Sequence, residues 1–144
     1  MNRKLSLESA YELKSPKDNI ELYSVWAETY DMDFINEMQY KLHFSVADEF
    51  ILNGGAGLVL DVGAGTGALA QALLQKGKFI IEATDISEEM LKIAKSKKIY
   101  KRSFLSDLTK EIPVDNSFYD GVVSSGTFTH GHVGPSSIRE LVRV

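Results

Sequence analysis

The sequence contains no cysteine, only three prolines and a single tryptophan. Without cysteine there can be no disulfide, thiolate nucleophile or cysteine-ligated metal, and such a composition fits the reducing cytoplasm. No apolar run approaches the length that a transmembrane helix needs, and the basic start of the chain lacks the apolar stretch of a secretory signal. We therefore expect a cytoplasmic protein without a membrane-spanning segment.

Excess positive charge is also missing. The chain has 20 acidic and 16 basic side chains, which gives a net charge of −4. This balance argues against nucleic acid as the main partner. One basic stretch is an exception to this balance. It spans the end of a predicted helix and the strand after it, and contains Lys92, Lys95, Lys97, Lys98, Lys101 and Arg102. Lysines suit the negative end of a helix, so we interpret the stretch as a solvated surface and expect no nucleic-acid partner.

A length of 144 residues with 44% apolar residues suits one domain with a real core. The first part, residues 1–17, is polar and contains Ser15-Pro16, a typical boundary signal. Residues 18–144 are predicted to form the domain. Apolar side chains about four positions apart predict helices over residues 19–30 and 36–52.

Beyond residue 57 short apolar runs alternate with helical patterns. The predicted strands cover residues 58–62, 79–84, 99–104 and 120–125. Helices are predicted over residues 68–76, after Ser87 as a cap, and from Pro135 onward. This alternation indicates an α/β fold with a doubly wound, mostly parallel sheet. Ligands of such sheets bind at the carboxyl ends of the strands.

A glycine loop follows the first predicted strand and opens the next helix. It carries Gly63, Gly65 and Gly67 directly after Asp61. Glycine lets the backbone turn tightly and lets a ligand approach, and the helix N-terminus behind it favours an anionic group. A pyrophosphate and the carboxylate of a methionine moiety both qualify.

Two enzyme classes therefore compete. Gly63, Gly65 and Ala68, with Asp85 about 20 residues on, also satisfy the dinucleotide pattern of a nicotinamide- or flavin-dependent oxidoreductase. Asp61 favours the other class, because an acid would repel pyrophosphate and attract the ammonium and sulfonium of S-adenosylmethionine. A non-catalytic binding module with the same fold is a third hypothesis.

Several segments resemble class I S-adenosylmethionine-dependent methyltransferases. Residues 61–67, DVGAGTG, resemble motif I, residues 84–91 resemble the second motif, and residues 118–123 resemble the fourth-strand signature. More narrowly, residues 26–31 and 131–135 resemble the methyltransferase-like group of the Williams–Beuren syndrome chromosome region. The resemblance implies a Rossmann-like methyltransferase fold, with S-adenosylmethionine as cofactor.

The resemblance also implies roles for individual residues. Asp85 would grip the ribose hydroxyls, Asp107 the adenine amino group, and Ile86 and Leu108 would sandwich the adenine. Tyr30 lies in a segment that folds over the cofactor in the family. The full predicted cofactor set is Tyr30, Asp61, Gly63, Ala64, Gly65, Gly67, Asp85, Ile86, Asp107, Leu108 and Ser125. Local alternatives stay open: Asp85 as a helix cap, Asp107 as the start of a turn, and apolar members as core.

Methyl transfer needs alignment of the reacting atoms and exclusion of water, and a base if the acceptor arrives protonated. His130 and His132 are the candidate bases, and they form no metal site because a third ligand is missing nearby. Residues 124–127 stand where amino-directed methyltransferases of DNA and protein carry an Asn/Asp-Pro-Pro-aromatic motif. This departure favours a small-molecule acceptor.

The end of the chain carries a further expectation. The resemblance implies a seven-stranded sheet with the strand order 3-2-1-4-5-7-6. This sequence supplies the first four of those strands. We expect a sheet truncated after the fourth strand, whose exposed edge can pair with another chain. Turnover is then in doubt more than cofactor binding is.

Overall fold

The computed structural model describes residues 7–37, 39–129 and 132–144. Its centre is a four-stranded parallel sheet in the order β3-β2-β1-β4, and its strands are β1 (Leu58–Val62), β2 (Ile80–Asp85), β3 (Arg102–Leu105) and β4 (Gly121–Val123). The α-helices are α1 (Leu7–Tyr11), α2 (Pro16–Trp26), α3 (Leu42–Leu52), α4 (Ala68–Lys76), α5 (Glu88–Ser96) and α6 (Ile138–Arg143). A π-helical segment, η1 (Asp31–Glu37), and a 3₁₀ turn, η2 (Pro135–Ser137), complete the chain. The predicted α/β class with a parallel sheet is confirmed.

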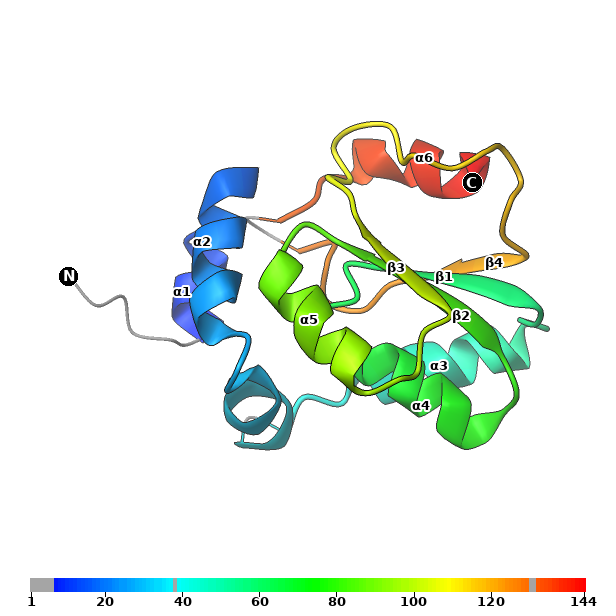
Figure 1. The fold of residues 1–144 in the computed structure, drawn as a ribbon, viewed down its shortest axis with the longest axis horizontal. Helices are drawn as coiled ribbons and strands as arrows, with labels where there is room; N and C mark the ends of the chain where they lie inside the picture. The colour runs from blue at the N-terminus through cyan, green and yellow to red at the C-terminus, as the bar shows by residue number, and fades with distance from the viewer. Residues whose placement is uncertain (1–6, 38, 130–131) are drawn as a thin grey trace.

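Helices cover both faces of this sheet (Figure 1), with α3, α4 and α5 on one face and α6 on the other. The side chains of β1 alternate between the two layers: Val59 packs in the core beneath α3 and α4, whereas Leu60 and Val62 pack with the α6 layer. A strand buried on both faces needs a continuous apolar run, which is what the sequence provides.

The elements after residue 57 follow the predicted pattern closely. Helix α4 has the predicted bounds, and Ser87 caps α5 by accepting a hydrogen bond from the Met90 amide at 3.3 Å. Strands β2, β3 and β4 lie within three residues of their predicted limits. These elements form where the sequence signal is local, in apolar runs and caps.

The two predicted N-terminal helices differ more. Helix α2 ends at Trp26 rather than residue 30, because Asp33 accepts hydrogen bonds from both the Trp26 indole at 3.2 Å and the Thr29 hydroxyl at 2.6 Å. The second helix begins at Leu42 rather than residue 36. Gln39 has a φ of 50°, a left-handed conformation that a continuous α-helix does not allow.

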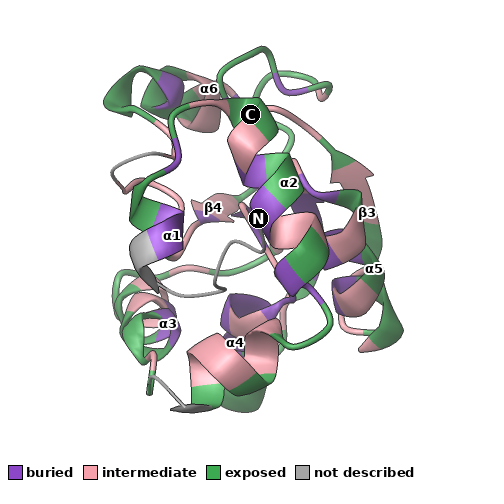
Figure 2. Cartoon of the chain, turned by 90° about the vertical axis from the view of Figure 1, so that its left-hand side faces the viewer, coloured by how far each residue is buried: buried purple, intermediate pink, exposed green. Residues whose placement is uncertain are grey.

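The N-terminal helices lie at the end of the sheet toward which the strands point (Figure 1). In Figure 2, which looks from that side, α1 and α2 lie in front of the strand ends. Ala10 and Leu13, from the segment predicted as polar, are buried with Leu22 and Trp26 in one apolar cluster. Residues 7–17 therefore help to cover the carboxyl ends of the strands.

Strand β4 occupies the edge of the sheet, as the resemblance implied, and among the described residues it pairs with β1 alone.

Within the described residues, every helix falls short of the length and apolar character that a bilayer crossing demands.

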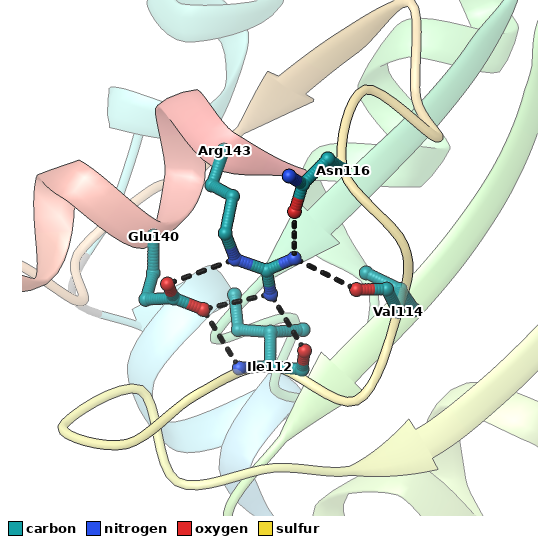
Figure 3. Close-up of polar contacts among 5 residues, drawn as sticks. All are labelled: Ile112, Val114, Asn116, Glu140 and Arg143. Atoms are coloured by element: carbon teal, nitrogen blue, oxygen red, sulfur yellow. Dashed lines mark hydrogen bonds and ion pairs between the residues drawn. The ribbon is translucent and has the colours of Figure 1, made fainter.

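Helix α6 is fastened to the long connection between β3 and β4 by one arginine (Figure 3). The five N–H groups of Arg143 donate to the Glu140 carboxylate, the carbonyls of Ile112 and Val114, and the Asn116 side chain, at 2.8–2.9 Å. Glu140 in turn accepts the Ile112 amide at 2.9 Å. The same connection carries residues 106–109, which line the site described below.

We expect Arg143→Lys to lower the thermal unfolding midpoint and to speed amide exchange in residues 112–117. A lysine ammonium has fewer donors than a guanidinium and lacks its planar geometry. Some carbonyl groups of the β3–β4 connection would therefore lose their hydrogen-bond donor. Arg139→Lys, an exposed position of the same helix, is the matched control. Equal midpoints for the two variants would show that the network does not stabilise the connection.

Candidate functional site

Two adjoining cavities open at the carboxyl ends of the strands, with volumes of about 240 Å³ and about 50 Å³. The larger cavity brings together most of the predicted residues: Tyr30, Gly63, Gly65, Asp85, Ile86, Asp107, Leu108, Ser125 and His132. The smaller one is lined by Asp61 and Ala64 and shares Tyr30, Gly63, Gly65 and Ser125 with the larger. Gly67 lines neither cavity. His130 lies outside the described residues.

At each of the three glycines of the loop, the absence of a side chain has a different consequence. A Cβ at Gly65 would meet no atom within 4 Å, so this glycine borders open space where a ligand can approach. At Gly63 a Cβ would collide with the Thr127 hydroxyl, so the missing side chain leaves room for the loop after β4. At Gly67 the neighbours are Ile99 and Tyr100, at 3.0 and 3.3 Å.

Asp85 ends β2 and holds the glycine loop. Its carboxylate accepts the Gly65 amide at 2.8 Å and the Ser87 amide at 2.9 Å. Burial raises the pKa of Asp85, and the hydrogen bonds from Ser87, Gly65 and Ile86 oppose that rise. The cap that the sequence left as an alternative is therefore present, and the same carboxylate also lines the larger cavity. A carboxylate has about four lone-pair directions, so these bonds leave capacity for a ligand hydroxyl.

Asp61 lies on β1 with 1% of its surface exposed. The Tyr100 hydroxyl donates to its carboxylate at 2.7 Å. Burial raises the pKa of Asp61 to about 7; the Tyr100 hydrogen bond pulls in the opposite direction, and the nearby Asp85 charge adds to the rise. The buried Asp61 and the partly buried Asp85 thus flank the glycine loop.

The β3–β4 connection supplies the far wall of the larger cavity. Asp107 accepts hydrogen bonds from the Thr109 amide at 2.9 Å and the Thr109 hydroxyl at 2.6 Å, which makes it the start of a turn as well as a lining residue. Burial alone would raise the pKa of Asp107, but the bonds from Thr109 and the nearby Lys110 hold it below its usual value. Ile86 and Leu108 present apolar surface to the same space.

Aromatic rings from the N-terminal region cover the cavities. Tyr30 stacks on Phe34 with centroids 5.0 Å apart and meets the Trp26 ring edge-on, also at 5.0 Å. Trp26 is fully buried, so packing is its main role. The sequence interpretation missed Tyr23, Phe34 and Tyr40 as lining residues. Tyr23 had a signal, because it lies seven positions before Tyr30 in the same helical pattern.

Three polar contacts fasten this aromatic cover to the loops of the sheet. Asp31 accepts a short hydrogen bond from the Thr66 hydroxyl in the glycine loop and pairs with Lys97 at 2.5 Å. The Tyr40 and Ser125 hydroxyls lie 2.9 Å apart. The third contact involves His132.

His132 sits between two hydroxyl groups. Its Nε2 lies 2.7 Å from the Tyr23 hydroxyl and its Nδ1 lies 2.9 Å from the Thr129 hydroxyl. The imidazole therefore links α2 to the loop after β4 while lining the larger cavity. The hydroxyls of Ser124 and Thr127 donate to the carbonyl of Val62 at 2.9 and 3.3 Å.

The cavity carries negative rather than positive charge. Among its described lining residues are Asp85 and Asp107, and neither lysine nor arginine. Nor do the described residues gather three or more side chains able to hold a metal ion.

The family model described as "Methyltransferase domain" matches residues 59–144, which is more than half of the chain. The chain belongs to this methyltransferase family. Human methyltransferase-like protein 27 is 29% identical over 138 residues, covering 92% of this chain and 56% of that protein. An uncharacterized methyltransferase of Bacillus mycoides is 35% identical over 114 residues, covering 76% and 52%.

Among solved structures, the methyltransferase fold of this chain is similar to that of the DhpI-SAH complex. The TM-score is 0.67 at 22% identity, over 88% of this chain and 63% of that one. This likeness supports the Rossmann-like methyltransferase fold. The chain spans about half the length of the curated relatives it matches. The oxidoreductase alternative gains no support from these matches.

We expect Gly63→Ala to destabilise the methyltransferase domain more than Gly65→Ala. Both glycines have a positive φ, of 63° and 55°, so each alanine costs about 1–2 kcal/mol of backbone strain. Only the Cβ at residue 63 also collides with Thr127, which adds about 1–3 kcal/mol of overpacking. Urea unfolding measures both free energies. Equal losses would contradict the assigned role of Gly63.

Proposed function

We propose that the chain binds S-adenosylmethionine at the two cavities and serves methyl transfer to a small-molecule acceptor. The observation that carries the proposal is the pair of carboxylates, the buried Asp61 and the partly buried Asp85, on either side of a glycine-rich loop. Buried anions call for a cationic or hydroxyl-rich partner. An adenosyl cofactor with an ammonium and a sulfonium group offers both.

The described residues fit such a cofactor part by part. Asp85 offers free lone pairs to vicinal ribose hydroxyls, and the apolar surfaces of Ile86 and Leu108 suit the two faces of a purine. Open space at Gly65 admits the linking atoms between the two cavities. Asp61, in the smaller cavity, suits the amino group of the methionine portion. Gly67 has no place in this scheme, because it borders Tyr100 instead.

When bound, the cofactor supplies an activated methyl group bonded to a positively charged sulfur. The chain's own residues would hold it, orient the acceptor and exclude water. The aromatic rings of Tyr23, Tyr30 and Phe34 provide the dry cover, and cation–π attraction favours a positive group beneath them. In this proposal His132 is the general base. It can receive a proton from an acceptor through the hydrogen bonds that it makes to hydroxyl groups.

The charge of the lining bears on the acceptor. Because the described residues offer carboxylates and no lysine or arginine at the larger cavity, phosphate-rich acceptors such as nucleic acid are poorly matched. A neutral or cationic small molecule is the better candidate. The edge of β4 is a proposed surface for strand pairing with another chain.

We expect S-adenosylhomocysteine to stabilise the purified chain and NADH to leave it unchanged. Ligand at 100 times its dissociation constant adds about 2.7 kcal/mol to the free energy of unfolding. A thermal shift series with both compounds measures this directly. Stabilisation by NADH without any response to S-adenosylhomocysteine would overturn the proposal in favour of a dinucleotide site.

We expect Asp85→Asn to weaken S-adenosylhomocysteine binding about 10- to 150-fold, because charge-assisted hydrogen bonds contribute about 1.5–3 kcal/mol. Asparagine is preferred to alanine here, since the Gly65 and Ser87 amides also depend on this side chain. Calorimetric titration measures the change, and Asp115→Asn in the exposed turn before β4 is the control. An unaltered affinity in the Asp85 variant would remove its assignment to the ribose.

A further inference from the structure

The buried acid Asp61 has a hydroxyl group, and not a cation, as its partner. The Tyr100 hydroxyl donates to Asp61 Oδ2 at 2.7 Å, and none of the ion pairs among the described residues includes Asp61. Glu82, another buried acid on the sheet, is different: it pairs with Arg102 at 2.7 Å. A carboxylate buried without a cation is costly, so the position of Asp61 indicates that a ligand completes it.

Tyr100 is held rigidly for this contact. It precedes β3, and its ring packs against the buried cluster of Ala64, Ala83 and Leu91. Its hydroxyl lies 3.3 Å from the point where a Cβ of Gly67 would stand. The bare backbone at Gly67 therefore makes room for Tyr100, which in turn fixes the direction of the Asp61 carboxylate.

We propose that Tyr100 is a positioning residue for the amino-acid end of the cofactor. By donating to one carboxylate oxygen, it orients Asp61 in the smaller cavity and favours the ionised form, which can then pair with an ammonium group. The inference rests on the proposed function, because it assumes that an adenosyl amino acid occupies the two cavities. It assigns to Tyr100 a role that acts through Asp61, without contact to the ligand.

The titratable groups around Asp61 are few. Asp85 lies on the neighbouring strand and adds negative charge. Tyr30 and His43 line the same small cavity. Burial raises the pKa of Tyr30 well above its usual value and lowers the pKa of His43. Near neutral pH both side chains are thus uncharged, and Asp61, whose pKa burial raises to about 7, is the group whose charge changes there.

The test compares two ligands over a pH range. S-adenosylhomocysteine carries the ammonium group, whereas 5′-methylthioadenosine has the same nucleoside and no amino-acid end. Titration from about pH 6 to about pH 8.5 spans the protonation of a buried carboxylate. Any effect of Asp85 on the ribose appears with both ligands, so the ratio of the two dissociation constants reports on Asp61. We expect the preference for S-adenosylhomocysteine to rise with pH and to level off above neutrality.

Tyr100→Phe removes the hydrogen bond and leaves the ring. We expect the midpoint of this pH profile to move upward in the variant, with about a tenfold loss of S-adenosylhomocysteine affinity on the acidic side for each pH unit of displacement. Affinity for 5′-methylthioadenosine stays unchanged. Tyr119→Phe is the matched control, because that hydroxyl donates to the buried Glu82 at 2.8 Å away from the cavities. It should lower stability and leave the profile in place.

The outcomes separate the two proposals. If the unaltered chain binds neither ligand, the proposed function fails. If it binds both and the Tyr100→Phe profile coincides with that of the unaltered chain, the role of Tyr100 fails while the function stands. If Tyr100→Phe does not fold, Asp61→Asn takes its place, and a pH-dependent preference that survives in that variant overturns the inference.

Discussion

Two carboxylates on neighbouring strands, the buried Asp61 and the partly buried Asp85, are the constraint on which this site depends. Asp61 and Asp85 lie on the paired parallel strands β1 and β2, so their side chains reach the same edge of the sheet. Asp85 engages backbone amides and Asp61 a tyrosine hydroxyl, and among the described residues neither forms an ion pair. The folded chain therefore places negative charge without a cation partner next to a glycine-rich loop, which supports the proposal that a cationic nucleoside binds there.

The N-terminal region strengthens the electrostatic interactions of these carboxylates. Its aromatic rings and its contacts through Tyr23, Asp31 and Tyr40 close the carboxyl ends of the strands. Because water is displaced there, each electrostatic interaction is stronger than it would be at an open surface.

The opposite face of the sheet shows how the chain treats an acid that has no ligand to meet. Glu82 is buried like Asp61, yet Arg102 and Tyr119 both donate to its carboxylate. Arg143 likewise satisfies the carbonyls of the β3–β4 connection and so supports the wall that carries Asp107 (Figure 3). Glu82 is thus balanced by a cation, whereas Asp61 has the Tyr100 hydroxyl as its partner.

The amino-acid sequence by itself determined the parallel α/β class, the limits of α4, the cap at Ser87 and the position of Asp85, because apolar runs, caps and glycines act over a few neighbouring residues. Tertiary structure alone decided why Gly67 lacks a side chain, which hydroxyl faces Asp61 and how Asp31 fastens the N-terminal cover. Those outcomes depend on contacts between distant segments, such as Tyr100 with Asp61 and Asp31 with Thr66, across 39 and 35 positions of chain. A local pattern carries no record of such partners, since folding brings them together only when the sheet and its cover form.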